Sequence, residues 1–166
     1  MVVLRRFIVL MALLFWQGGF LFYSSVVVPI GQEVLASHKD QGFITQRVTD
    51  YLNLSGAVAL ALLLWDLALA RDPARWRLWV RGLTWLAMGI ALIWLAWWHV
   101  QLDALLEPDY KEVINRRLFT IGHRWYLWIS TVQWGCGLIF LWTTLWSWRC
   151  ADRVGSAMAS GNELAH

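Results

Sequence analysis

The sequence predicts an all-α fold, a four-helix transmembrane bundle, and three observations carry this prediction. Hydrophobic residues make up 59% of the 166 residues and charged residues only 15%, whereas a typical soluble domain is about 25% charged. The charged residues cluster between long apolar runs, and 14 tryptophans gather near the ends of these runs. This composition excludes a disordered chain. It also argues against a nucleic-acid-binding protein, because the net charge of +3 is not spread along one exposed face.

Four apolar stretches are long enough to span a membrane, which takes about 20 residues for roughly 30 Å of hydrocarbon. They cover about residues 7–29, 51–70, 78–100 and 125–148. The first stretch carries no charge between Arg6 and Glu33. It continues well past the length of a signal-peptide core, and no small-x-small cleavage site follows at the right distance. We therefore expect a retained first helix.

The second and fourth helices are predicted to begin outside the outer membrane face. Residues 37–40 have the spacing of a capping box, and apolar residues then recur at helical intervals. The second helix should therefore start near residue 42. Pro108 ends any extension of the third helix, and residues 109–112 form a second capping-box pattern. The fourth helix should therefore start near Tyr110.

One domain is predicted over residues 1–153, followed by a flexible polar tail over residues 154–166. The tail is rich in small and polar residues, which favour disorder at a chain end. The second and third helices are joined by a short turn. In that turn Asp72 is a candidate N-cap and Pro73 a candidate first helical residue.

The basic residues near the span ends predict that both termini are cytoplasmic. Eight arginines then lie on the inner side: Arg5, Arg6, Arg71, Arg75, Arg77, Arg81, Arg149 and Arg153. Six basic residues lie outside: Lys39, Arg47, Lys111, Arg116, Arg117 and Arg124. The tryptophans at the span ends fit an interfacial aromatic belt. We expect a multi-pass protein of the bacterial inner membrane.

The order of several short motifs resembles the transmembrane protein 205 family of small four-helix membrane proteins. The motifs are Trp16-x-Gly18-Gly19-x-x-Phe22 followed by Pro29, then Gln46, Tyr51-x-Asn53, Leu106-Glu107-Pro108, Arg116 and Phe119-x-x-x-His123. The resemblance covers most of the chain, from the first helix to the fourth. It implies a compact four-helix bundle and leaves the activity open.

Polar residues near the outer ends of the helices predict an outward-facing cavity. Asp50 and Asn53 lie one turn apart near the outer surface, at a level similar to that of His123. The ligand-binding candidates are Asp50, Asn53, Glu107, Arg116 and His123. We predict that this cavity binds a small ligand or ion.

The outer histidines also allow a metal or haem site. His99 and Asp103 are four residues apart and so share one helix face. Together with His123, and with Glu107 or His38, they could bind zinc or copper. His99 and His123 could instead be the axial ligands of a b-type haem. The simpler alternative is that these are hydrated interfacial residues, and no cofactor is the main expectation.

Among the polar residues inside the predicted spans, two glutamines and one aspartate stand out. Gln17 and Gln133 lie near mid-span and should form interhelical hydrogen bonds, with each other or along a substrate path. Asp66 lies near the inner end of the second span. We expect it to pair with Arg71 or Arg75, because an unpaired charge in a span is costly. A proton relay is the alternative role for Asp66.

The sequence contains no nucleotide-binding loop, nucleophile motif or zinc-protease motif, so we expect a non-enzymatic protein. Its predicted function is to bind a small ligand or ion, or to serve as an accessory subunit of a membrane complex. The alternative is a metal- or haem-binding redox protein that uses His99 and His123. A third interpretation is a purely structural subunit. The expected partners are the lipid bilayer and either other membrane subunits or further copies of the chain, with no nucleic acid.

Overall fold

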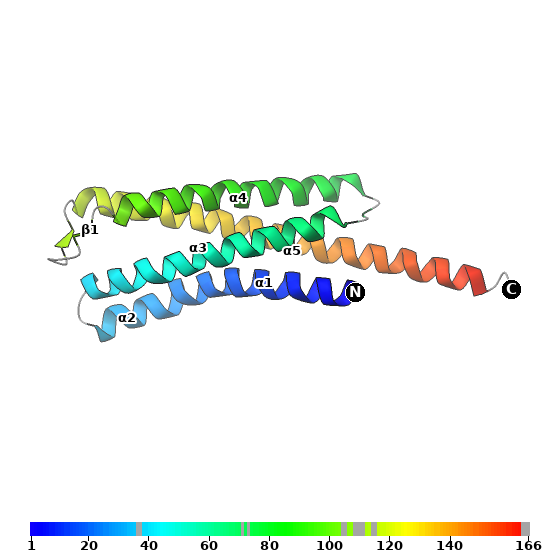
Figure 1. The fold of residues 1–166 in the computed structure, drawn as a ribbon, viewed down its shortest axis with the longest axis horizontal. Helices are drawn as coiled ribbons and strands as arrows, with labels where there is room; N and C mark the ends of the chain where they lie inside the picture. Colours follow the sequence, from blue (N-terminus) through cyan, green and yellow to red (C-terminus); the bar gives the residue numbers. More distant parts are fainter. Residues whose placement is uncertain are drawn as a thin grey trace.

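The computed structural model is all-α, with four long helical segments that run alternately up and down the long axis (Figure 1). It describes residues 1–35, 38–70, 72, 74–103, 106–107, 112–113 and 116–163. The helical elements are α1 (Val2–Phe22), η1 (Tyr23–Val27), α2 (Val28–Val34), α3 (His38–Ala68), α4 (Arg75–Asp103) and α5 (Arg116–Glu163). Two short strands, β1 (Leu106–Glu107) and β2 (Glu112–Val113), pair antiparallel.

The first segment is one continuous helix with a π-helical turn in its middle. α1, η1 and α2 follow one another without a break, and the N–H of Val28 bonds to the carbonyl of Tyr23. Such π-turns are rare and often occur at functional sites. Pro29 follows Val28, just after this turn. Because proline cannot donate a backbone hydrogen bond inside a helix, the irregular hydrogen bonding of the π-turn lies next to the position that needs it.

Several helix ends differ from those that the sequence predicted. α3 begins at His38 rather than near residue 42. α5 begins at Arg116 rather than near Tyr110, because Glu112 and Val113 pair with Leu106 and Glu107 as strands. Glu107 is therefore not on the face of α4. α5 continues to Glu163, through most of the segment expected to be a polar tail.

The two ends of the bundle differ in the segments that they hold. The N-terminus, the C-terminal part of α5 and the turn between α3 and α4 lie at one end, called here the terminal end (Figure 1). The two strands and the start of α3 lie at the other, the hairpin end. α1 packs on α3, α3 on α4, and α4 on α5, whereas α1 and α5 contact each other at far fewer positions. The bundle is therefore least closed between its first and last helices.

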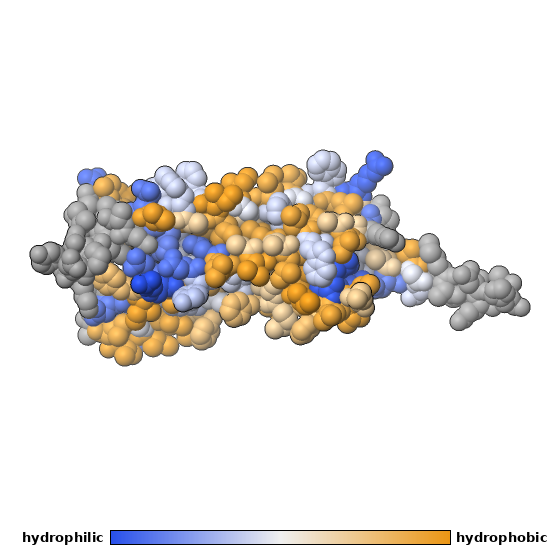
Figure 2. All heavy atoms as spheres, viewed as in Figure 1, coloured by the Kyte–Doolittle hydropathy of each residue, from blue (hydrophilic) through white to orange (hydrophobic). Residues whose placement is uncertain are grey.

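The molecule has an apolar surface and a partly polar interior. Many large apolar side chains are exposed, among them Phe15, Trp79, Ile93, Val132 and Trp142. Figure 2 shows an apolar middle with hydrophilic side chains gathered toward both ends. The buried residues include Asp66, Arg81, His99, Gln133 and Thr144 beside an apolar core of Val9, Leu13, Leu63, Met88 and Phe140. A protein folded in water buries its large apolar side chains and leaves charged ones at the surface.

Within the described residues, three helical segments are long and apolar enough to cross a membrane. They are Val2–Val34, Asp40–Ala68 and Arg75–Leu102. The fourth predicted span, in α5, is not among them. Gln133 and several Ser, Thr and Trp residues interrupt its apolar residues and lower its mean hydropathy. α5 nevertheless exposes large apolar residues in this stretch, among them Val132 and Ile139.

Two glycines let helices approach closely around α1. A Cβ atom added at Gly56 of α3 would lie 2.7 Å from the Trp16 indole of α1. One added at Gly137 of α5 would lie 3.1 Å from the Gln17 amide. A Cβ atom added at Gly18 of α1 would meet nothing within 4 Å. α1 is therefore approached closely by α3 and α5 at their own glycines, Gly56 and Gly137, and not at Gly18.

Candidate functional site

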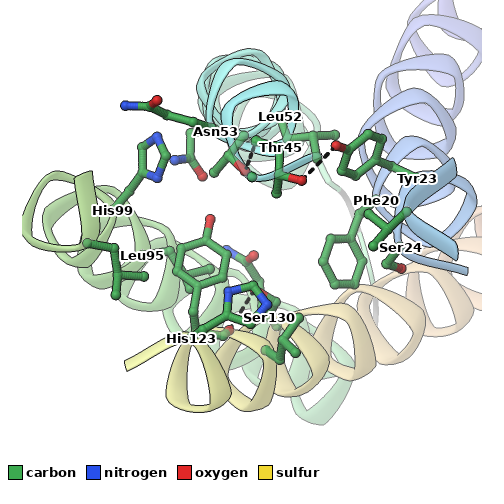
Figure 3. A pocket seen from close by; sticks show the side chains of 18 of the residues that line it. Phe20, Tyr23, Ser24, Thr45, Leu52, Asn53, Leu95, His99, His123 and Ser130 are labelled. Carbon is green, nitrogen blue, oxygen red and sulfur yellow. Dashed lines mark hydrogen bonds between the residues drawn. The ribbon is translucent and has the colours of Figure 1, made fainter. Parts of the chain in front are cut away.

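A cavity of about 510 Å³ lies between the helices in the half of the bundle nearer the hairpin end. α1, η1, α3, α4 and α5 all contribute to its wall (Figure 3). Its polar lining consists of Gln17, Tyr23, Ser24, Gln32, Gln41, Thr45, Gln46, Thr49, Asn53, His99, His123, Tyr126, Ser130 and Gln133. Its apolar lining consists of Trp16, Phe20, Val28, Leu52, Leu95, Leu102, Phe119 and Leu127, with Gly42 completing the wall.

The π-helical turn η1 brings polar side chains to the cavity from the first helix. The Tyr23 hydroxyl donates a 3.0 Å hydrogen bond to Thr45 Oγ1 of α3. The Thr45 hydroxyl in turn donates to the Gln41 carbonyl at 2.8 Å. Figure 3 shows Tyr23 reaching across to Thr45 at one side of the cavity. This contact holds η1 against α3 and fixes that part of the wall.

The two glutamines predicted inside the spans are part of the cavity wall. Gln133 Nε2 of α5 donates to the Met88 carbonyl of α4 at 2.9 Å, which confirms an interhelical bond for this residue. Gln17 packs on Gly137 of α5. Both glutamines line the cavity, so each has a packing role and a surface available to a ligand.

His99 is held by a carboxylate on a neighbouring helix. Its Nε2 lies 3.1 Å from Asp50 Oδ1 of α3. α3 and α4 pack along their length and bring these two side chains together. The metal site that the sequence allows combines His99 with Asp103, whose side chain lies outside the described residues. His99 is buried, whereas the side chain of Asp50 is 55% exposed.

His123 lies in the α5 wall, just before the predicted fourth span. Its ring stacks on Phe119, one turn earlier, with centroids 6.1 Å apart and planes 6° from parallel. Burial lowers the pKa of His123 below its usual value of 6.5, because desolvation disfavours the charged imidazolium. The imidazole is therefore neutral at pH 7 and can act as donor or acceptor.

Among the described residues that line the cavity there is no Asp, Glu, Lys or Arg. Its polar groups are amides, hydroxyls and imidazoles, which donate and accept hydrogen bonds. Such a lining suits an uncharged ligand, because a buried ion would lack a counter-charge in the wall.

The structure brings some of the predicted site residues together and leaves others apart. Asn53, His99 and His123 line the same cavity, and Asp50 lies beside it through its contact with His99. Glu107 is in β1 and Arg116 begins α5; their side chains, like those of His38 and Asp103, lie outside the described residues. No group of three or more His, Cys, Asp or Glu in the described part of the chain could hold a metal ion. Zinc, copper and haem binding stay predictions.

Sequence reasoning missed a large share of the cavity wall. Gln41, Thr45 and Thr49 recur every four residues on one face of α3, a spacing that could have identified them. Tyr23 and Ser24 had no such signal, because a π-helical turn has no clear pattern in a single sequence. Tyr126 and Ser130 lie in a run that reads as a plain apolar span.

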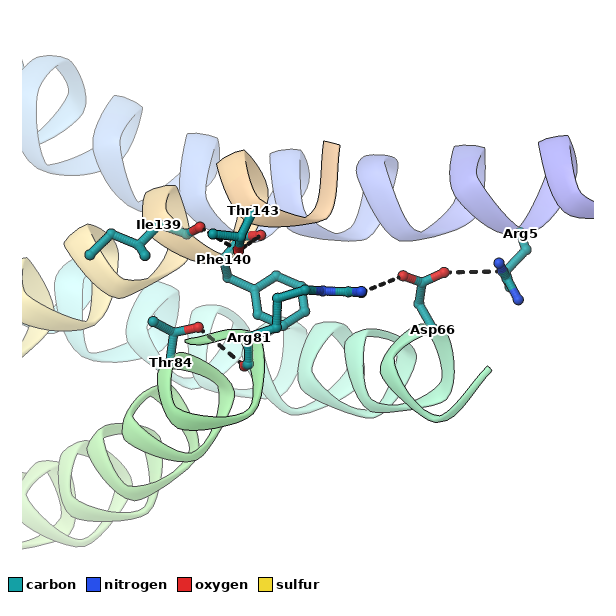
Figure 4. A network of polar contacts seen from close by, with 7 residues as sticks. All are labelled: Arg5, Asp66, Arg81, Thr84, Ile139, Phe140 and Thr143. Atoms are coloured by element: carbon teal, nitrogen blue, oxygen red, sulfur yellow. Dashed lines mark hydrogen bonds and ion pairs between the residues drawn. The ribbon is translucent and has the colours of Figure 1, made fainter. Parts of the chain in front are cut away.

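A second polar cluster lies at the terminal end, around Asp66 (Figure 4). Asp66 Oδ2 accepts a 2.8 Å hydrogen bond from Arg81 Nη2, and Asp66 Oδ1 lies 3.0 Å from Arg5 Nε. The expected partners were Arg71 and Arg75; Arg71 lies outside the described residues. The actual partners come from α1 and α4, which converge on this position of α3. The Arg81 guanidinium also lies over the Phe140 ring, 5.4 Å from its centroid.

Two further ion pairs surround this cluster. In the turn between α3 and α4, Asp72 accepts two hydrogen bonds from Arg77, at 2.6 and 2.8 Å, and one from the N–H of Ala74. The Arg77 hydrogen bond is the main cause that lowers the pKa of Asp72 to about 2. Arg6 of α1 pairs with Asp152 of α5 at 2.7 Å. These contacts join all four helical segments at the terminal end, and the proton relay for Asp66 stays a prediction.

The scan against family models finds no match, and the searches of curated proteins and of solved structures find no similar chain. The resemblance to the transmembrane protein 205 family therefore stays a prediction.

Proposed function

We propose that this chain is an integral membrane protein that binds a small uncharged ligand in the cavity near its hairpin end. The observation that carries this proposal is the cavity itself, lined by amides, hydroxyls and imidazoles inside a bundle whose surface is apolar. Buried polar groups are costly unless they are paired. A ligand with matching groups would complete the hydrogen bonds that these side chains can make.

The membrane setting is supported by the distribution of the side chains. Three helical segments are long and apolar enough to span a bilayer, and we propose that α5 provides a fourth span over about residues 125–148. Exposed tryptophans lie toward the ends of the apolar middle, namely Trp76, Trp79, Trp94, Trp97, Trp125, Trp128, Trp142 and Trp146. Tryptophan is enriched at membrane interfaces.

We further propose that the terminal end faces the cytoplasm and the cavity lies on the outer side of a bacterial inner membrane. Arg5, Arg6, Arg75, Arg77 and Arg149 belong to the terminal end. Basic residues favour the cytoplasmic side of a membrane. With this orientation the ligand would come from the outer half of the bilayer or from the space outside it.

A ligand-binding test can use two adjacent residues of α5. The Ser130 hydroxyl donates to the Tyr126 carbonyl and the Thr131 hydroxyl to the Leu127 carbonyl, at 2.9 and 2.8 Å. Ser130 lines the cavity, whereas Thr131 is exposed on the outside of the bundle. Ser130→Leu should fill part of the cavity and weaken ligand binding, while Thr131→Leu removes a similar local bond and leaves the cavity unchanged.

The measurement is the thermal stability of the purified protein in nanodiscs, with and without each member of a panel of uncharged compounds and lipids. A ligand at one hundred times its Kd should raise the stability by about 2.7 kcal/mol. We expect at least one compound to stabilise the wild type and the Thr131→Leu variant, but not Ser130→Leu. The proposal would be contradicted if no compound stabilised the wild type, or if every stabilising compound acted equally on the wild type, Thr131→Leu and Ser130→Leu.

A further inference from the structure

We infer that the cavity holds the ring of an isoprenoid quinone, and that the apolar tail of this molecule leaves the bundle between α1 and α5. This inference rests on the proposed function and names the ligand class of the same site. Three features carry it: the place where the bundle is least closed, the flat aromatic groups in the wall, and the hydrogen-bonding character of the lining.

The route for a tail lies between the first and last helices. α1 and α5 contact each other far less than the other neighbouring helices do, and the cavity is partly open. On the α1 side its wall is made by Phe20, Ser24 and Val28, and on the α5 side by Leu127 and Ser130. Figure 3 shows Phe20 and Ser24 on the side where α1 approaches α5. A molecule dissolved in the bilayer could enter here without crossing water.

The two helical segments that flank this opening expose apolar side chains, which are compatible with lipid. Phe15, Phe22 and Val26 on the first helix and Leu127, Val132 and Leu138 on α5 are all exposed. Deeper in the bundle the opening ends where Gln17 packs on Gly137. An occupant would therefore keep its polar head in the cavity and its apolar tail along the outer part of the two helices, which is the geometry of a lipid-borne amphiphile.

The shape of the lining favours a flat head. The stacked rings of Phe119 and His123 present a planar surface in the α5 wall, while Trp16 and Phe20 contribute further rings from α1. Aromatic side chains favour offset or edge-on packing against another ring. A planar ring fits such walls better than a puckered sugar or a branched glycerol head would.

The amide groups of the lining can satisfy a head that only accepts hydrogen bonds. The two carbonyl oxygens of a quinone ring are acceptors only, and the side-chain amides of Gln17, Gln46 and Asn53 can donate N–H groups to them. A polyhydroxylated head would donate many hydrogen bonds, for which carboxylates are the strongest acceptors. The described lining contains no carboxylate.

Two neighbouring serines of η1 give a matched test of the opening. Both the Ser24 and the Ser25 hydroxyl donate to the Leu21 carbonyl. Ser24 lines the cavity, whereas Ser25 is exposed and lies outside the lining. Ser24→Trp should therefore block the opening. Ser25→Trp adds the same indole ring on the outer surface of the helix, away from the cavity. His123→Phe keeps an aromatic ring beside Phe119 but removes its hydrogen-bonding nitrogens.

The experiment measures saturable binding of a tritiated, short-tailed ubiquinone analogue to the whole protein in nanodiscs. We expect Ser24→Trp to weaken binding by about tenfold or more and Ser25→Trp to leave it unchanged. Loss of one neutral hydrogen bond predicts an effect of about three- to tenfold for His123→Phe. Equal stability of the three variants, checked by thermal unfolding, excludes misfolding as the cause of any loss.

Failure of this inference can be told apart from failure of the proposed function. If the quinone analogue does not bind saturably but another uncharged compound stabilises the wild type and not Ser130→Leu, the quinone assignment is wrong and the cavity still binds a ligand. If Ser24→Trp and Ser25→Trp bind the analogue alike, the route between α1 and α5 is wrong. If no compound binds, both proposals fail.

Discussion

Asp66 and Arg81 are both fully buried, and a 2.8 Å hydrogen bond joins Asp66 Oδ2 to Arg81 Nη2. Arg5 lies on the other carboxylate oxygen, at 3.0 Å. The negative charge of this carboxylate therefore offsets the positive charges of two guanidinium groups, which come from two different helices. Within the described residues, Nε and Nη1 of Arg81 have no hydrogen-bond partner, so the arginine depends on Asp66 more strongly than an exposed arginine would.

Asp66→Asn should therefore destabilise the protein severely. Removal of one partner of a buried ion pair leaves an uncompensated charge and costs about 3 to 5 kcal/mol. Thermal or denaturant unfolding in detergent measures this loss. Asp152→Asn is the matched control, because Asp152 also pairs with an arginine, Arg6, but is exposed. A change at Asp66 no larger than that at Asp152 would contradict the structural role of the cluster.

The stability should also depend on pH through Asp72. Its pKa is about 2 in the folded protein against 3.8 for a free side chain. Because the folded value is the lower one, the stabilisation is fully present above pH 3.8 and is lost as the pH falls toward 2. The unfolding free energies of the wild type and of Asp72→Asn should therefore differ at pH 6 and converge as the pH approaches 2. A difference that stays constant over this interval would show that Asp72 does not titrate as described.

The sequence alone predicted the helical fold well, because composition and apolar run length are strong signals. Three of the four expected spans fall in helical segments that are long and apolar enough to cross a membrane. The helix ends were predicted less well. The start of α5 depends on the pairing of β1 with β2, and two such short strands leave no periodic pattern in a sequence.

The candidate site could be predicted only where a residue type stands out in an apolar chain. Asn53, His99 and His123 were found in this way, and the cavity brings them together. The partners of charged residues were not found, because they depend on which helices pack together. His99 meets Asp50 of α3, and Asp66 meets Arg5 of α1 and Arg81 of α4, so each of these contacts joins two different helices.

A side chain at Gly56 should destabilise the packing of α3 on α1. A Cβ atom there would lie 2.7 Å from the indole of Trp16, which is buried in the core and lines the cavity. Overpacking of this kind costs about 1 to 3 kcal/mol, so Gly56→Ala should lower the unfolding temperature and weaken ligand binding. Gly18→Ala is the control, since Gly18 faces open space and alanine favours a helix over glycine by about 1 kcal/mol. Equal effects of the two substitutions would contradict the close packing at Gly56.

The proposed orientation makes a prediction about both termini together. The N-terminus and the C-terminal part of α5 lie at the same end of the bundle, so reporters fused to either terminus must give the same answer (Figure 1). Because the arginines of this end favour the cytoplasm, green fluorescent protein at either terminus should fluoresce, and alkaline phosphatase there should be inactive. Phosphatase inserted between β1 and β2 should be active.

Two fusion results would count against this arrangement in different ways. If the two termini report opposite sides, α5 does not cross the membrane, and its lower hydropathy is the reason. The cavity wall that α5 provides would then lie outside the bilayer, and a lipid-borne ligand could not enter between α1 and α5. If both termini report the outer side, the bundle is inverted. The cavity would then receive its ligand from the cytoplasmic half of the membrane, with the same lining and the same route of entry.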